Sequence, residues 1–118
     1  MTELEALGLT LAIELPVAFA WFGLARWLER ADWGRGVLVV IAASLLSHPL
    51  AWRANEAWLR AWPFWPRATV IEVGVAIVEA GVLAWGLSLG RRRAIVVAVT
   101  MNAASFGLGL LLFYALRA

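Results

Sequence analysis

The sequence predicts an all-α integral membrane four-helix bundle, with a short interfacial amphipathic segment between the second and third spans. Three observations predict it. Hydrophobic residues make up 64% of the 118 residues, and the mean hydropathy is +0.83. Charged residues make up only 15%, whereas soluble domains are about a quarter charged. The apolar residues also fall into four runs of about 20 residues, the length that crosses a bilayer as a helix.

The four runs are expected to form a single transmembrane domain that occupies residues 1–118. We expect the spans at about residues 6–25, 36–52, 68–90 and 94–116. Pro16 lies in the first span beside Glu14, and Pro49 lies in the second span beside His48. Because proline cannot donate a backbone hydrogen bond, we expect a kink beside Glu14 and local unwinding beside His48.

Residues 53–67 contain no long apolar run but are rich in aromatic and cationic side chains. Trp58, Trp62 and Trp65 alternate with arginines, a pattern typical of a helix that lies in the headgroup region. We expect this helix to end at Pro63. Its simplest role is an aromatic belt that fixes the depth of the protein; the alternative is a surface that gathers lipid or substrate.

All ten cationic residues are arginines, and they punctuate the apolar runs instead of forming one patch. This distribution argues against a nucleic-acid partner and favours contacts with membrane lipids. The loops after the first and third spans hold six of them: Arg26, Arg30, Arg35, Arg91, Arg92 and Arg93. The positive-inside rule therefore predicts a plasma (inner) membrane protein with both termini outside.

Two further features narrow the class of protein. The chain has no cysteine, so it has neither a disulfide nor a thiolate metal site. The first residues are MTELEALG, and a signal peptide would need basic residues there. We therefore expect the first apolar run to be retained as a span. No cofactor is expected, and the narrowness of a four-helix pore makes a homo-oligomer a reasonable expectation.

Each expected span carries one polar face. An acidic side chain near the centre of a spanning helix costs roughly 2.5–3.5 kcal/mol, so these faces should point inward. Glu72 and Glu79 are seven residues apart, two helical turns, and therefore share a face. The predicted site consists of Glu14, His48, Glu72, Glu79 and Asn102, with Ser47, Ser105, Pro16 and Pro49 in support.

Helical rise predicts three levels within this site. His48 and Glu72 would lie nearest the outer surface, Glu14 would lie deeper, and Glu79 would lie deepest, beside Asn102. Asn102 and Ser105 have a simpler interpretation as interhelical hydrogen-bond partners. His48 can equally be a structural hydrogen-bond partner. Three inward glutamates exceed what packing needs, because glutamine would bond as well without an ionisable group, and this favours a function for at least one of them.

Three functional hypotheses follow. The glutamates could be protonation sites of a small proton- or cation-coupled transporter. Small multidrug resistance transporters are similar in size and helix number and have one essential glutamate in the first span, but here the core-facing positions lack an aromatic substrate cage. Alternatively, His48 with Glu14 and Glu72 could form a membrane-embedded enzyme or metal site. The third hypothesis is a non-catalytic subunit or scaffold of a membrane complex. No catalytic residue can be assigned.

One pattern touches all four spans and resembles small uncharacterised prokaryotic four-span membrane proteins. It consists of Glu14 and Pro16, Ser47 and Pro49, Glu72 and Glu79, and Asn102, Ser105, Phe106 and Gly109. The resemblance implies a shared helical bundle and no activity that can be named.

Overall fold

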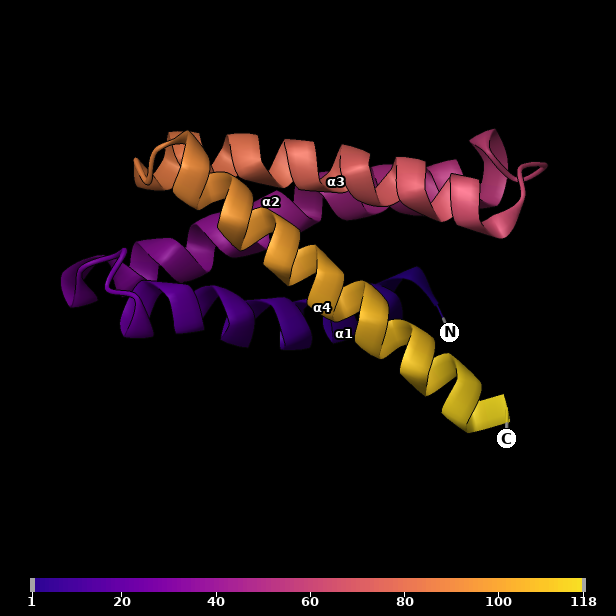
Figure 1. The fold of residues 1–118 in the computed structure, drawn as a ribbon, viewed down its shortest axis with the longest axis horizontal. Coiled ribbons are helices and arrows are strands. Elements are labelled where there is room, and N and C mark those ends of the chain that lie inside the picture. Colours follow the sequence, from indigo (N-terminus) through magenta and orange to yellow (C-terminus); the bar gives the residue numbers. More distant parts are fainter. Residues whose placement is uncertain (1, 118) are drawn as a thin grey trace.

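The computed structural model describes the backbone of residues 2–117, and their side chains except those of residues 113, 116 and 117. Within this range the fold is all-α (Figure 1). Short π-helical stretches, Ala20–Leu24 and Ala54–Trp58, continue the first two helices, and a 3-10 turn, Arg30–Asp32, precedes the second. The long helices are α1 (Glu3–Phe19), α2 (Trp33–Arg53), α3 (Phe64–Leu87) and α4 (Arg91–Arg117).

All four are long and apolar enough to cross a membrane. Counted with their extensions, the apolar helices cover Glu3–Leu24, Arg30–Trp58, Phe64–Leu87 and Arg91–Leu112. The number and order of helices predicted from the sequence are confirmed. Their ends differ by several residues: the second helix, with its extensions, runs from Arg30 to Trp58 instead of 36–52, and α3 begins at Phe64 instead of residue 68.

Local signals explain where the helices begin and end. The hydroxyl of Thr2 accepts a hydrogen bond from the backbone N–H of Glu5 (3.1 Å), which caps the first turn of α1. At the other end of the bundle, Ser88 adopts a left-handed conformation (φ 54°) that ends α3. Gly90 also has a positive φ of 83°, which glycine adopts without steric cost, so the chain reverses into α4 within three residues.

The helices form a ring in which each contacts its two neighbours: α1 packs on α2 and α4, and α3 packs on α2 and α4. Both chain termini and the α2–α3 connection lie at one end, which we call the terminal end (Figure 1). The α1–α2 and α3–α4 connections lie at the opposite end, the arginine end. In this view α4 runs diagonally and diverges from α3 toward the terminal end.

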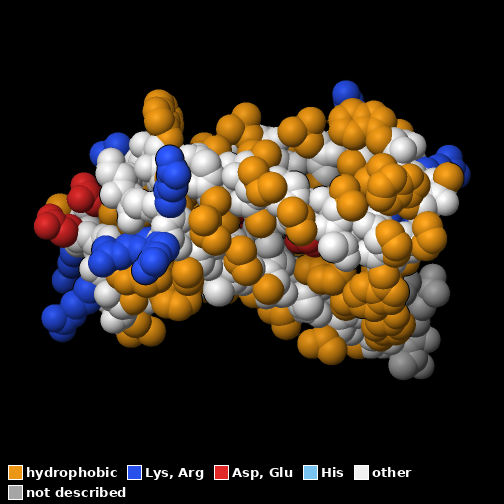
Figure 2. Space-filling view, turned by 45° about the horizontal axis from the view of Figure 1, so that its top comes forward, with side chains coloured by type: hydrophobic (Ala, Val, Ile, Leu, Met, Phe, Trp, Pro, Cys, Tyr) orange, Lys and Arg blue, Asp and Glu red, His pale blue; other side chains and the backbone are white. Residues whose placement is uncertain are grey.

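The two halves of the bundle are packed differently. A cluster of fully buried apolar side chains, which includes Phe22, Val40, Leu83, Val97 and Met101, fills the half near the arginine end. Many large apolar side chains face outward, and Trp85, for example, is 87% exposed. Figure 2 shows hydrophobic side chains along the length of the molecule and arginines toward its two ends. This surface suits the apolar interior and charged boundaries of a bilayer.

The predicted amphipathic helix between the second and third spans is wrong. The helical path of α2 continues through the π-helical stretch to Trp58, and Pro63 precedes α3 instead of ending a helix. Pro63 has a φ of −57°, which suits the residue before a helix, where no N–H needs an intrahelical partner. Trp58, Trp62 and Trp65 remain exposed at this end, so their role as an aromatic belt stays a prediction.

The predicted unwinding beside His48 is also wrong, because α2 remains helical through Pro49 to Arg53. Pro16 likewise lies inside α1. In both helices the irregularity comes later, as a π-helical stretch that begins four residues after Pro16 and five after Pro49. Each proline removes a single backbone donor, and the neighbouring helices hold the rest of the turn in place.

Gly86 allows α2 and α3 to approach closely. A Cβ atom at this position would lie 2.8 Å from Cγ1 and 2.9 Å from Cγ2 of Val39, a stiff side chain that cannot move aside by rotation. We predict that Gly86→Val lowers the free energy of unfolding in mixed micelles by about 1–3 kcal/mol, the usual cost of overpacking. Gly81→Val is the matched control, because a Cβ at Gly81 meets nothing within 4 Å. Equal stability of the two variants would contradict the close approach.

Candidate functional site

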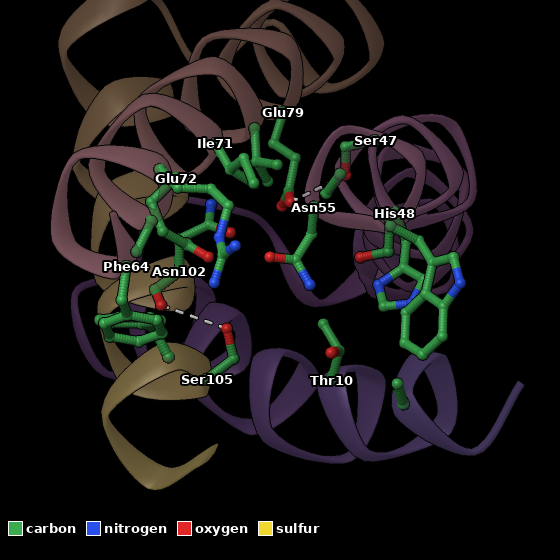
Figure 3. Close-up of a pocket in the computed structure, with 18 residues that line it drawn as sticks. Thr10, Ser47, His48, Asn55, Phe64, Ile71, Glu72, Glu79, Asn102 and Ser105 are labelled. Atoms are coloured by element: carbon green, nitrogen blue, oxygen red, sulfur yellow. Dashed lines mark hydrogen bonds between the residues drawn. The ribbon is translucent and has the colours of Figure 1, made fainter. Parts of the chain in front are cut away.

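A cavity of about 320 Å³ lies among the four helices toward the terminal end, where the apolar core stops (Figure 3). Figure 2 shows an acidic side chain at the bottom of a hollow in the otherwise apolar surface, between α3 and the diverging part of α4. Every long helix contributes polar side chains to the cavity. They are Thr10 from α1, Ser44, Ser47 and His48 from α2, Arg67, Glu72 and Glu79 from α3, and Asn102 and Ser105 from α4.

Glu79 is the acidic side chain held most directly against this cavity. Glu79 is 1% exposed. Its Oε1 accepts a hydrogen bond from the Ser47 hydroxyl at 3.1 Å, across the contact between α2 and α3. Its Oε2 is also buried and has no hydrogen-bond partner in the described part of the chain. A buried polar atom without a partner is costly, so this oxygen is a position for a proton or a ligand's donor.

Glu14, on α1, is held in the same way by a second serine of α2. It is fully buried, and its Oε1 accepts a hydrogen bond from the Ser44 hydroxyl at 2.8 Å. Its Oε2 likewise lacks a partner among the described residues. Ser44 lines the cavity whereas Glu14 does not, so the hydroxyl links this carboxyl to the cavity.

The spacing of two serines explains why both carboxyls meet at one helix. Ser44 and Ser47 are three residues apart and therefore face the same side of α2. Because α2 lies between α1 and α3 in the ring, one serine reaches Glu14 and the other reaches Glu79. Glu14 is also near enough to Glu72 and Glu79 for their charges to repel if ionised.

His48 does not pair with Glu72 as predicted. The two side chains lie on opposite sides of the cavity, with Asn55 between them in the view (Figure 3). The carboxyl that interacts electrostatically with His48 is that of Glu3, at the start of α1. The His48 ring lies 6.2 Å from the Trp52 ring, and its Nε2 is buried without a partner among the described residues.

The metal hypothesis fails on geometry. Within residues 2–117, as far as the structure describes them, no group of three or more histidine, cysteine or acidic side chains is arranged to hold a metal ion. His48, Glu14 and Glu72 come from three helices, and their side chains do not converge on one point.

Asn102 and Ser105 line the cavity but bond within their own helix. The Asn102 amide donates to the carbonyl of Ala98 at 2.8 Å, and the Ser105 hydroxyl donates to the carbonyl of Asn102 at 3.2 Å. The Asn102 side chain also interacts with that of Glu79 on α3, as expected of an interhelical partner placed beside Glu79, whereas the Ser105 bond stays within α4. Both residues give α4 a polar face toward the cavity.

Sequence reasoning missed Arg67 and the aromatic lining. A third span that starts at residue 68 leaves Arg67 in the headgroup region, yet this residue lines the cavity. Trp52, Phe64 and Phe106 also line it, and none of these three was among the predicted site residues. A helix start at Pro63, where proline is well tolerated, would have placed Phe64 and Arg67 on α3.

Comparison of the chain with protein-family models, curated proteins and solved structures finds no match. The resemblance to small prokaryotic four-span membrane proteins therefore remains a prediction from a residue pattern.

The two serine–glutamate bonds predict a specific pattern of energetic coupling. Ser47→Ala should lower the free energy of unfolding by about 1–3 kcal/mol, because it leaves a buried carboxyl oxygen without a partner. Double-mutant cycles in mixed micelles measure the coupling. The pairs Ser44 with Glu14 and Ser47 with Glu79 should couple more strongly than the crossed pairs Ser44 with Glu79 and Ser47 with Glu14. Equal coupling in matched and crossed pairs would refute the assignment.

Proposed function

We propose that this chain is a membrane protein that exchanges protons for a small cationic solute. The observation that carries the proposal is the polar cavity toward the terminal end. Glu79 lines this cavity, and Glu14 lies behind the lining residue Ser44, whose hydroxyl bonds to it. Each of these carboxyls has one buried oxygen without a partner in the described structure. A carboxyl of this kind can bind either a proton or a cation but not both. Because the two compete for the same group, binding of one releases the other, which is the basis of coupled exchange.

The charges around the cavity favour a cationic solute over an anionic one. Glu72 and Glu79 line the cavity and Glu14 lies behind Ser44, whereas Arg67 is the only guanidinium among the described lining residues. Binding a cation near the glutamates offsets their mutual repulsion and replaces the protons that they would otherwise hold. The aromatic side chains of Trp52, Phe64 and Phe106 add faces that attract cations.

The packing suggests how access is limited to one side. The apolar cluster around Phe22, Leu83 and Met101 fills the arginine end, whereas the polar cavity lies toward the terminal end, where α4 diverges from α3. With both termini outside a plasma (inner) membrane, as the distribution of arginines predicts, this conformation would face outward. The exchange cycle then requires a second conformation in which the cluster opens and α4 closes against α3.

Proteoliposomes test the proposal directly. Guanidinium is a suitable probe because it stays charged at any usable pH and carries several N–H donors. Addition of millimolar guanidinium outside should drive proton release from vesicles that contain the wild-type protein. Glu79→Gln and Glu14→Gln should reduce this exchange to the rate of empty vesicles, because glutamine cannot take up and release the proton.

Glu29→Gln is the matched control, because Glu29 is exposed and lies in the connection between α1 and α2. It should exchange at the wild-type rate. Wild-type exchange in both the Glu79 and the Glu14 variants would overturn the proposal, as would the absence of exchange from the wild-type protein.

A further inference from the structure

We infer that the cationic group of the solute is the ammonium of a single-chain amphiphile with a zwitterionic head, in which this ammonium and a phosphate are joined by a short linker. The inference rests on the proposed function and specifies its substrate class. The ammonium would lie at Glu72, the phosphate at Arg67, and the alkyl chain in an apolar groove between α3 and α4. Three features of the structure carry this assignment.

The first feature is a groove that continues the cavity. It has a volume of about 560 Å³ and is lined by Phe64, Ser105, Phe106, Gly109, Leu110 and Tyr114. Phe64, Ser105 and Phe106 line the cavity as well, so the two spaces share a boundary. The hollow between α3 and α4 in Figure 2 lies on this side of the molecule. A molecule can therefore place a polar head in the cavity and an apolar tail in the groove.

The second feature is the order of side chains along α3. From the deepest position outward the cavity wall presents Glu79, Glu72, Arg67 and then Phe64, which borders the groove. At 1.5 Å per residue these are separated by steps of about 10, 8 and 4 Å along the helix. Acid, base and aromatic ring thus follow one another in the order in which ammonium, phosphate and alkyl chain follow one another in such an amphiphile.

The third feature is the way Arg67 is held at the boundary. Its Nη1 donates a hydrogen bond to the carbonyl of Arg60 at 3.2 Å, and its guanidinium lies 6.0 Å from the centre of the Phe64 ring. A guanidinium has five N–H donors in a planar fork, so this bond leaves donors for a bidentate contact with phosphate. Glu72 is five residues from Arg67, about 8 Å along the helix, and its carboxyl is the acceptor for an ammonium N–H.

The groove is long enough to hold an alkyl chain. Ser105 and Tyr114 are nine residues apart, which corresponds to about 14 Å of helix. Gly109 keeps the middle of this stretch open, because a Cβ there would meet nothing within 4 Å. A leucine at this position would fill the groove without displacing the backbone.

Native mass spectrometry of the detergent-purified protein tests the inference on the wild type first. The probe is a monoacyl glycerophosphoethanolamine, compared with the monoacyl glycerophosphate that lacks the ammonium and with glycerophosphoethanolamine that lacks the chain. We expect the complete amphiphile to bind at least about tenfold more tightly than either truncated form, the effect of one charge-assisted hydrogen bond or of a buried chain. Equal or tighter binding of the monoacyl glycerophosphate would overturn the inference.

Two substitutions locate the phosphate and the chain. Arg67→Gln should weaken binding of the complete amphiphile about tenfold, through loss of a charge-assisted bond. Gly109→Leu should reduce its affinity to that of glycerophosphoethanolamine. Gly81→Leu is the control, since a Cβ at Gly81 also meets open space and Gly81 lines neither the cavity nor the groove. Equal binding by the Gly109 and Gly81 variants would overturn the placement of the alkyl chain in the groove.

The outcomes separate the two proposals. Guanidinium exchange without binding of the amphiphile would refute the substrate class and leave the proposed exchange standing. Tight, chain-dependent binding without any exchange would refute transport and leave the site.

Discussion

A carboxyl group buried in an apolar helix needs a polar partner, and the structure depends on how two such groups are supplied with one. Glu14 and Glu79 are on helices that are not neighbours in the ring, and neither could face hydrocarbon without a cost of roughly 2.5–3.5 kcal/mol. Ser44 and Ser47 meet this need from α2, which lies between the two helices. The two bonds fix the rotation of α1, α2 and α3 about their axes.

The arrangement makes the two halves of the bundle different. Near the arginine end the helix faces are apolar and close on one another around Leu83 and Met101. Toward the terminal end the same faces carry the glutamates, Asn102 and Ser105, which cannot pack as tightly, and α4 diverges there. The cavity is therefore a consequence of the polar residues, and in the proposed function it becomes the place where a proton and a cation compete.

The length of the apolar runs is enough to predict the four helices and their order, and the cost of a carboxyl in lipid predicts the inward positions of Glu14 and Glu79. Chain geometry beyond one helix was harder to predict. Pro49 and Pro63 both predict a break in a helix. The structure keeps α2 helical through Pro49, and Pro63 precedes the first residue of α3 instead of ending a helix. Because α3 starts at Phe64, Arg67 lies on this helix and lines the cavity. His48 was paired with Glu72 by depth alone, whereas its position around the α2 axis turns it toward Glu3.

The central claim is that the polar faces line one water-accessible cavity and do not face the membrane. The chain contains no cysteine, so single cysteines can report accessibility to a membrane-impermeant thiol reagent in proteoliposomes. Ser105→Cys and Asn102→Cys replace cavity-lining residues, and Val99→Cys lies on the outward face of α4, where Val99 is 49% exposed. The account predicts modification of the first two and protection of the third by lipid. Fast modification of Val99→Cys with protection of both cavity positions would contradict it.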